Sequence, residues 1–266
     1  MPRIGPTSTA NTPILRTAAA LVLCAGRQAP LRAQAEAPPS TTLAYFHDTG
    51  PVSRRGAAPG VVLSFPVHVA GADWLRLAFD RVDLAGDLFA GEGAILRGTS
   101  TLDGAVQELN ALHVRQWRRT TAYFNGDTVL VEVVAYPGTG PSRVVLDSVT
   151  AGWPPAPDSQ CGPTDDRVLS SDARSARLLP VGCTGWLIAD CAGCFLTAGH
   201  CDGGLSVAQF NVPLSTGGGA LNNPSPDDQY AVDAASLQSN GGLGVGDDWA
   251  CFGTFANSNT GLTARQ

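Results

Sequence analysis

The chain has 266 residues, of which 44% are hydrophobic and 15% are charged, a composition typical of a globular protein and not of a disordered one. Its formal net charge is -6 and it contains no lysine, so it lacks the basic surface by which proteins hold phosphate backbones or anionic lipid. Nucleic acid is therefore excluded as an expected partner.

Residues 1–35 have the layout of a secretory signal. Arg3 and Arg16 precede a short apolar run at 18–25, and Ala33-Gln34-Ala35 follows as a cleavage site. The apolar run is too short to span a bilayer. We therefore expect a secreted or periplasmic protein without a membrane span; a disordered, alanine-rich leader is the alternative interpretation.

Residues 40–151 are expected to form an all-β accessory domain or pro-domain. Four short stretches are β-branched or alternate apolar with polar residues, and turn residues bound them: 61–65, 74–79, 129–136 and 143–146. Asn125-Gly126-Asp127 is a turn signal just before the third stretch. This pattern predicts an antiparallel β-sandwich, and it resembles CUB and proprotein-convertase P-type sandwiches.

The histidines and the one basic cluster of this region are interpreted as structural. His47, His68 and His113 each lack a second ligand at metal spacing. The run 115–119, Arg-Gln-Trp-Arg-Arg, is a candidate contact for an acidic protein or a carbohydrate. A strand with a solvated arginine face explains the run equally well and is the preferred interpretation. We expect neither a metal nor an organic cofactor.

A proline-rich linker at 152–160 separates this domain from a cysteine-rich part. If cleavage removes Cys24, six cysteines remain, all in the last 106 residues. They are Cys161, Cys183, Cys191, Cys194, Cys201 and Cys251. An even number in an exported chain predicts disulfides, with 15 possible connectivities.

Two segments of the cysteine-rich part resemble trypsin-like serine proteases. Residues 183–188, Cys-Thr-Gly-Trp-Leu-Ile, and 194–201, Cys-Phe-Leu-Thr-Ala-Gly-His-Cys, are similar to the adjacent strands that precede and carry the histidine in that family. The resemblance covers roughly 160–266, so it implies the N-terminal part of a protease domain, 161–266, with the first of two β-barrels. It further implies a Cys183–Cys201 disulfide and His200 as the general base of a Ser-His-Asp triad.

The resemblance also implies a downstream carboxylate that orients the histidine. The family pattern is an aspartate followed by a bulky apolar residue and a small one, and Asp248-Trp249-Ala250 fits it. Asp247 is the neighbouring alternative.

The start of this part resembles bacterial members of the clan. Thr164-Asp165-Asp166-Arg167-Val168 is similar to the mature start of glutamyl-endopeptidase-like enzymes. Arg167, Arg174 and Arg177 are candidate processing sites.

The catalytic serine of the family is missing from the expected place. No Gly-Asp-Ser-Gly-Gly segment follows Asp248, Ser258 lacks flanking glycines, and Ser215 precedes the aspartate. We therefore expect a fragment of a secreted endopeptidase that acts on polypeptides, without its second barrel and inactive by itself. The alternative is a catalytically inactive, protease-like extracellular binding protein.

A zinc site is the other interpretation of the cysteines. Cys191, Cys194, His200 and Cys201 offer four tetrahedral ligands, but their spacing is too short for a zinc ribbon or finger. Alternatively, Cys191 and Cys194 close a small loop, or one of them pairs with Cys161 or Cys251.

Overall fold

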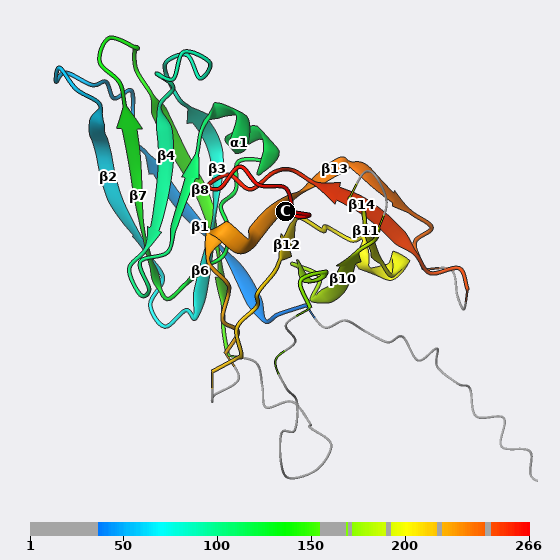
Figure 1. Ribbon diagram of the computed structural model, residues 1–266. Helices are drawn as coiled ribbons and strands as arrows, with labels where there is room; N and C mark the ends of the chain where they lie inside the picture. Colours follow the sequence, from blue (N-terminus) through cyan, green and yellow to red (C-terminus); the bar gives the residue numbers. More distant parts are fainter. Residues whose placement is uncertain (1–36, 155–168, 170–171, 190–192, 217–219, 243–245) are drawn as a thin grey trace, which may run out of the picture. The chain divides into compact units, whose positions relative to one another are not determined.

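The computed structural model describes residues 37–154, 169, 172–189, 193–216, 220–242 and 246–266 (Figure 1). The predicted secretory signal, residues 155–160 of the predicted linker, Cys161 and Cys191 lie outside these ranges. The described part is all-β, as predicted, and consists of two four-stranded sheets and one closed barrel. No helix in it is both long and apolar enough to cross a bilayer.

The two four-stranded sheets share one hydrophobic core and form a sandwich. The first sheet has the order β1 (Ser40–Asp48), β8 (Arg143–Gly152), β3 (Trp74–Asp83) and β6 (Phe124–Asn125). The second has the order β2 (Gly60–His68), β7 (Thr128–Ala135), β4 (Ile95–Ser100) and β5 (Val106–Leu109). All pairs are antiparallel, and every second residue of β7 is buried. This alternation is the period-2 pattern that predicted the sandwich.

The four predicted strands are present as β2, β3, β7 and β8, but four others were not predicted. β1 lies at the edge of its sheet, where none of its residues is fully buried. Its sequence does not alternate clearly between apolar and polar residues. The predicted turn at 125–127 is confirmed: Gly126 has a φ of +86°, which glycine adopts without a steric penalty. At this turn the chain passes from β6 of one sheet to β7 of the other.

The basic run at 115–119 is not a strand, so the preferred interpretation of it was wrong. It ends the helix α1 (Ala111–Gln116), whose N-cap Asn110 accepts hydrogen bonds from the backbone N–H groups of Leu112 and His113. Trp117 is 3% exposed, and the two arginines after it have left-handed backbones. Arg115 in the helix and the two arginines after it are exposed, whereas Val114 and Trp117 are buried.

The three histidines of the sandwich have separate surroundings. His47 stacks on the ring of Phe65 with 4.1 Å between centroids, and His68 Nδ1 lies 2.8 Å from the hydroxyl of Thr128. His113 lies half-buried in α1, and its Nδ1 has no hydrogen-bond partner. Burial lowers the pKa of His113, while a hydrogen bond to the Glu108 carbonyl opposes that shift.

We expect His113 to make stability fall in mild acid. Its folded-state pKa lies below the unfolded value of about 6.5, so the unfolded chain binds more protons, and the free energy of unfolding decreases as pH falls through 6.5. Urea unfolding at pH 7.5 and pH 5.0 measures the decrease, which His113→Phe should reduce. The control Leu112→Ala, an exposed change on the same helix that removes no titratable group, should keep the wild-type difference. An identical pH dependence in His113→Phe would contradict the assignment.

The second part of the chain is a closed six-stranded barrel with the order β10-β11-β14-β13-β12-β9. Its strands are β9 (Ser175–Leu179), β10 (Cys183–Leu187), β11 (Phe195–Thr197), β12 (Val207–Gln209), β13 (Gln229–Ser239) and β14 (Ala250–Thr254). The segments predicted as adjacent strands are β10 and β11, which pair through Trp186 and Leu196. The rings of Phe195 and Phe252 stack in its core, 5.1 Å apart.

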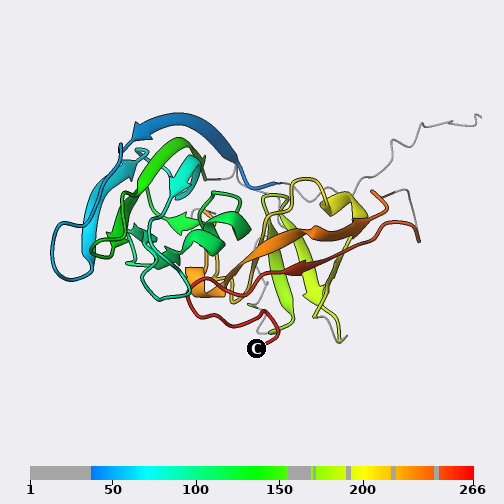
Figure 2. The same ribbon diagram turned by 90° about the horizontal axis from the view of Figure 1, so that it is seen from above.

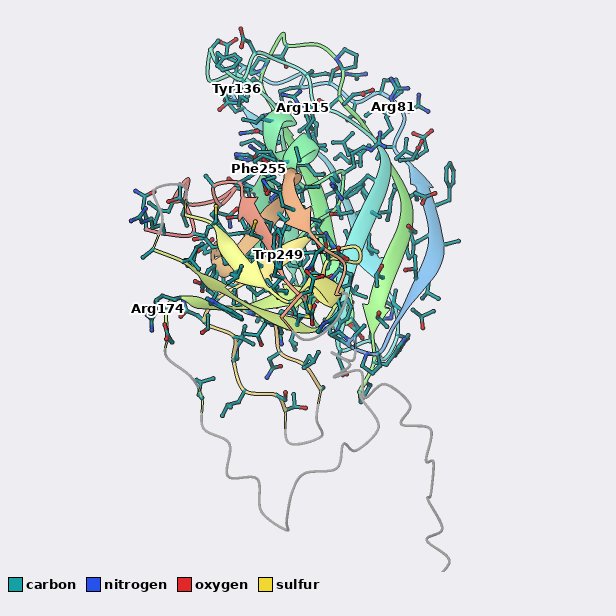
Figure 3. All side chains as sticks on the ribbon, turned by 90° about the vertical axis from the view of Figure 1, so that its right-hand side faces the viewer. Arg81, Arg115, Tyr136, Arg174, Trp249 and Phe255 are labelled. Atoms are coloured by element: carbon teal, nitrogen blue, oxygen red, sulfur yellow. A yellow bond between two sulfur atoms is a disulfide. The ribbon has the colours of Figure 1, made fainter. Side chains whose placement is uncertain are left out.

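The candidate processing sites differ in accessibility. Arg174 is 74% exposed and pairs with Asp172 at the start of the barrel (Figure 3). Arg177 is half-buried in β9, where its guanidinium donates to the side chains of Gln209 and Asn223. Burial lowers the pKa of Arg177 to about 10. Arg177 is therefore unsuited to cleavage in the folded protein, and Arg167 lies outside the described residues.

Candidate active site

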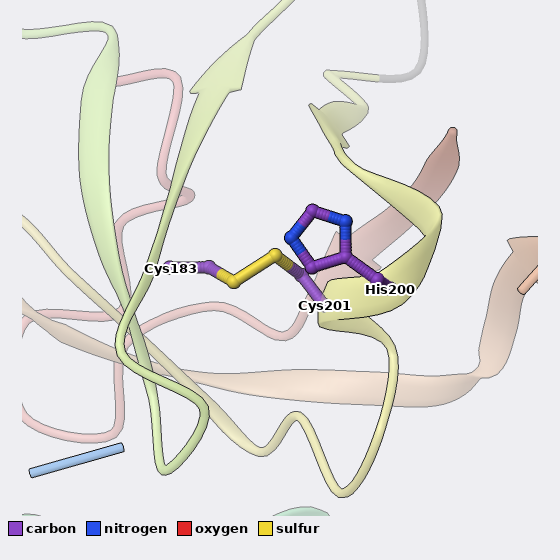
Figure 4. Close-up of side chains that lie close together, drawn as sticks. All are labelled: Cys183, His200 and Cys201. Carbon is purple, nitrogen blue, oxygen red and sulfur yellow. A yellow bond between two sulfur atoms is a disulfide. The ribbon is translucent and has the colours of Figure 1, made fainter. Parts of the chain in front are cut away.

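His200 lies in a single 3-10 turn, η1 (Gly199–Cys201), directly after β11. The predicted disulfide between Cys183 and Cys201 is confirmed, and it ties this turn to the first residue of β10. Figure 4 shows the imidazole of His200 beside that bridge. A cross-link next to His200 restricts the backbone that presents the ring, which favours one fixed orientation.

Asp248 lies in the loop before β14, and strand pairing brings it to His200. Thr197, the last residue of β11, pairs with Ala250, the first residue of β14. His200 follows Thr197 by three residues and Asp248 precedes Ala250 by two, so the pairing brings the two segments together. His200 Nδ1 lies 2.8 Å from Asp248 Oδ2, and the His200 backbone N–H donates to Oδ1 at 3.0 Å. These hydrogen bonds, the backbone one foremost, lower the pKa of Asp248, so the carboxylate is ionised at neutral pH.

The neighbouring Asp247 has a different partner. Its Oδ1 accepts a hydrogen bond from the side chain of Asn240. The backbone of Asn240 donates to the Trp249 carbonyl, and its Oδ1 accepts from the Trp249 N–H at 3.0 Å. Asn240 thus holds the loop that carries Asp248, a role that sequence reasoning missed. The Asn-Gly-Gly run at 240–242 was the only available signal, and it is an ordinary turn pattern.

Gly199 allows the His200 and Asp248 loops to approach each other. A Cβ added to Gly199 would lie 2.6 Å from Asn240 Oδ1, 2.7 Å from the Gly242 nitrogen and 2.9 Å from the Trp249 carbonyl oxygen. Two of these atoms are backbone, so relief requires movement of the loop itself. The site therefore requires glycine at position 199, because any side chain there would collide with the loop that carries Asp248.

We expect Gly199→Ala to separate His200 from Asp248 and to destabilise the barrel by about 1–3 kcal/mol, the usual cost of overpacking. Chemical shifts of His200 and a urea titration measure the two effects. Gly203→Ala is the matched control, because a Cβ at Gly203 meets no atom within 4 Å. A Gly199→Ala protein with unchanged His200 shifts and unchanged stability would refute the close packing.

The His200–Asp248 pair is open to solvent, since the side chains are 41% and 33% exposed. The Nδ1 contact with a carboxylate favours the neutral tautomer that carries its proton on Nδ1 and its lone pair on Nε2. Trp249, next to Asp248, is 43% exposed and lies on the barrel surface (Figure 3). The site therefore presents an imidazole, hydrogen-bonded through Nδ1 to a carboxylate, on an accessible, partly aromatic surface.

Neither candidate serine is placed beside His200. The Ser258 hydroxyl is buried without a hydrogen-bond partner, and Ser215 lies in the loop after β12. Ser239 lies near the turn, but its hydroxyl donates to the Gly199 carbonyl and accepts from the Gly241 N–H. Among the residues described, no serine makes a hydrogen bond with the His200 ring.

The sulfur and nitrogen atoms near His200 do not form a zinc site. Ligand atoms of Cys183, His200 and Cys201 lie within 4.8 Å of one another, but the two sulfurs are bonded together. Zinc binds thiolates, so the disulfide removes Cys201 from the alternative ligand set. Of the other cysteines, Cys194 lies just before β11 and Cys251 lies half-buried in β14, where it has no disulfide within the described ranges.

No family model, curated protein or solved structure matches this chain.

Proposed function

We propose that this chain carries the histidine–aspartate pair of a secreted, trypsin-like serine endopeptidase. The observation that carries the proposal is the two-point hydrogen bond of Asp248 to the ring and the backbone of His200. A general base must be held in one tautomer and one orientation, and an ionised carboxylate on Nδ1 does both. The Cys183–Cys201 bridge beside the pair supports export to an oxidising compartment.

In the proposed reaction, Nε2 of His200 takes the proton of a serine hydroxyl as that oxygen attacks the carbonyl carbon of a peptide bond. Asp248 stabilises the imidazolium that results. The proton then passes to the leaving amine, and water releases the acyl group by the reverse proton transfers. Within the described part of the chain no serine is hydrogen-bonded to the His200 ring, so the proposal takes the serine from sequence beyond Gln266.

An extracellular binding protein is the second candidate function. Three large apolar side chains on and beside β10 and β14 are between 36% and 44% exposed: Trp186, Ile188 and Trp249. Aromatic residues at a surface of this kind are common anchors of protein–protein contacts. This function needs no serine, and it predicts a barrel that binds without cleaving.

The test is to sequence the transcript through and past the codon for Gln266, and to express the complete product. A continuation that carries a Gly-Asp-Ser-Gly-like segment and reacts with a fluorophosphonate probe would support the endopeptidase. His200→Ala should abolish that labelling. A confirmed stop codon after Gln266, or a continuation that is not labelled, would refute the endopeptidase and leave the binding function.

A further inference from the structure

A buried side-chain amide of the barrel holds one backbone residue of the sandwich. Gln229, at the start of β13, is fully buried. Its Oε1 accepts from the Tyr123 N–H at 2.9 Å, and its Nε2 donates to the Tyr123 carbonyl at 2.8 Å. Both backbone groups of Tyr123 therefore depend on the barrel. A buried backbone group without a partner costs about 1–3 kcal/mol, so this contact favours the docked state.

Between Asn125 and Asn223 the roles of the two parts are exchanged: here a side-chain amide of the sandwich pairs with a backbone residue of the barrel. The side-chain Oδ1 of Asn125, in the sandwich, accepts from the Asn223 N–H at 2.7 Å. Its Nδ2 donates to the Asn223 carbonyl at 2.9 Å. The sandwich thus also satisfies a backbone residue of the barrel.

A third amide contact comes from the segment after β14. Asn259 Oδ1 accepts from the Glu108 N–H at 2.9 Å, and its Nδ2 donates to the Val106 carbonyl at 2.7 Å. These two groups lie on β5, the edge strand of the second sheet. The chain end therefore pairs with an edge that would otherwise present unpaired backbone groups.

Apolar packing continues across the same contact. Leu179, Val207 and Ala231 of the barrel belong to the hydrophobic core of the sandwich, and each is at most 2% exposed. Phe255, after β14, is partly buried against that core (Figure 3). Arg76 of β3 donates to the Ser206 hydroxyl at 2.9 Å. A shared core and reciprocal amide pairs are features of an interface that forms on folding and stays closed.

The contact lies on the barrel wall opposite the His200 site. The sandwich meets β12 and the adjoining ends of β9 and β13, whereas His200 follows β11 and Asp248 precedes β14. In the closed order of six strands, β12 is opposite β11. Figure 2 shows β13 starting beside the sandwich and extending away from it. The docked sandwich therefore leaves the His200 surface accessible.

We propose that the sandwich remains bound to the barrel after the chain between them is cut, and is a lasting part of the mature protein instead of a removable pro-domain. The reciprocal amide pairs at Gln229, Asn125 and Asn259 carry this inference. It does not rest on the proposed proteolytic function, since it concerns only the association of the two parts.

The experiment uses the full chain with Cys24→Ser, in which the recognition sequence of a site-specific protease is inserted after Ala156. Residues 37–157 contain no cysteine, so no disulfide can hold the two pieces together after cleavage. We expect the cut protein to elute in size-exclusion chromatography as one species of the uncut mass, with both pieces on a denaturing gel. Separate elution of the sandwich, or its loss from a precipitated barrel, would overturn the proposal.

A variant of the cut protein tests the amide pairs. Asn125→Ala with Asn259→Ala removes five hydrogen bonds between the parts, one of them long at 3.4 Å. Each of the four shorter ones contributes about 0.5–1.5 kcal/mol, so dissociation should rise about 30-fold or more in a dilution series. Asn222→Ala is the matched control, because that side chain donates only to Leu214 within the barrel. Equal dissociation in the double variant and the control would contradict the assigned role.

Discussion

Replacing Asp248 with asparagine should lower kcat about 10⁴-fold in the serine-bearing enzyme that the proposed function requires. Asparagine keeps the shape of the side chain but can present an amide N–H to His200 Nδ1. The ring would then carry its proton on Nε2, where the lone pair is needed. The loss should appear mainly in kcat, because the substrate-binding surface is unchanged.

The effect of Asp248→Asn on the tautomer of His200 can also be measured in the 266-residue chain, without a catalytic serine. We expect ¹⁵N NMR of neutral His200 to show the Nδ1–H tautomer in the wild type and a shift toward Nε2–H in Asp248→Asn. Asp247→Asn is the matched control, since Asp247 contacts Asn240 and not the ring. Equal tautomer spectra for wild type and Asp248→Asn would remove the basis for the proposed role of Asp248.

Replacing both Cys183 and Cys201 with serine should lower the free energy of unfolding of the barrel by about 3 kcal/mol. The bridge closes a loop with a sequence separation of 18 residues, and the chain entropy released by opening such a loop corresponds to about that value. The turn that carries His200 should also lose its fixed orientation, because Cys201 is the next residue.

Urea unfolding without reductant measures this loss, with Cys251→Ser as the control. Cys251 is a half-buried cysteine of the same barrel that forms no disulfide within the described ranges, so its substitution should cost well under 3 kcal/mol. A double serine variant as stable as Cys251→Ser would show that the bridge contributes little to the fold.

Local sequence patterns predicted the elements whose signals are short-range. Alternation along β7 and the turn at Gly126 were readable from neighbouring residues, and the histidine segment with its flanking cysteines was found through its resemblance to trypsin-like proteases. The α1 helix was missed because six residues are too few for a helical period, and Asn110 is also a common turn residue. β1 was missed because an edge strand buries little.

The amino-acid sequence by itself determined the all-β class, because pleat periodicity and turn residues act over a few positions, and its resemblance to trypsin-like proteases implied that β10 and β11 are adjacent. Only the tertiary structure decided that Asp248, and not Asp247, lies against His200, because the pairing of β11 with β14 joins segments about 50 residues apart. It likewise decided that Gln229, Asn125 and Asn259 join the sandwich to the barrel. Amides look alike along a sequence, and their partners are backbone groups that come within reach only when both parts have folded.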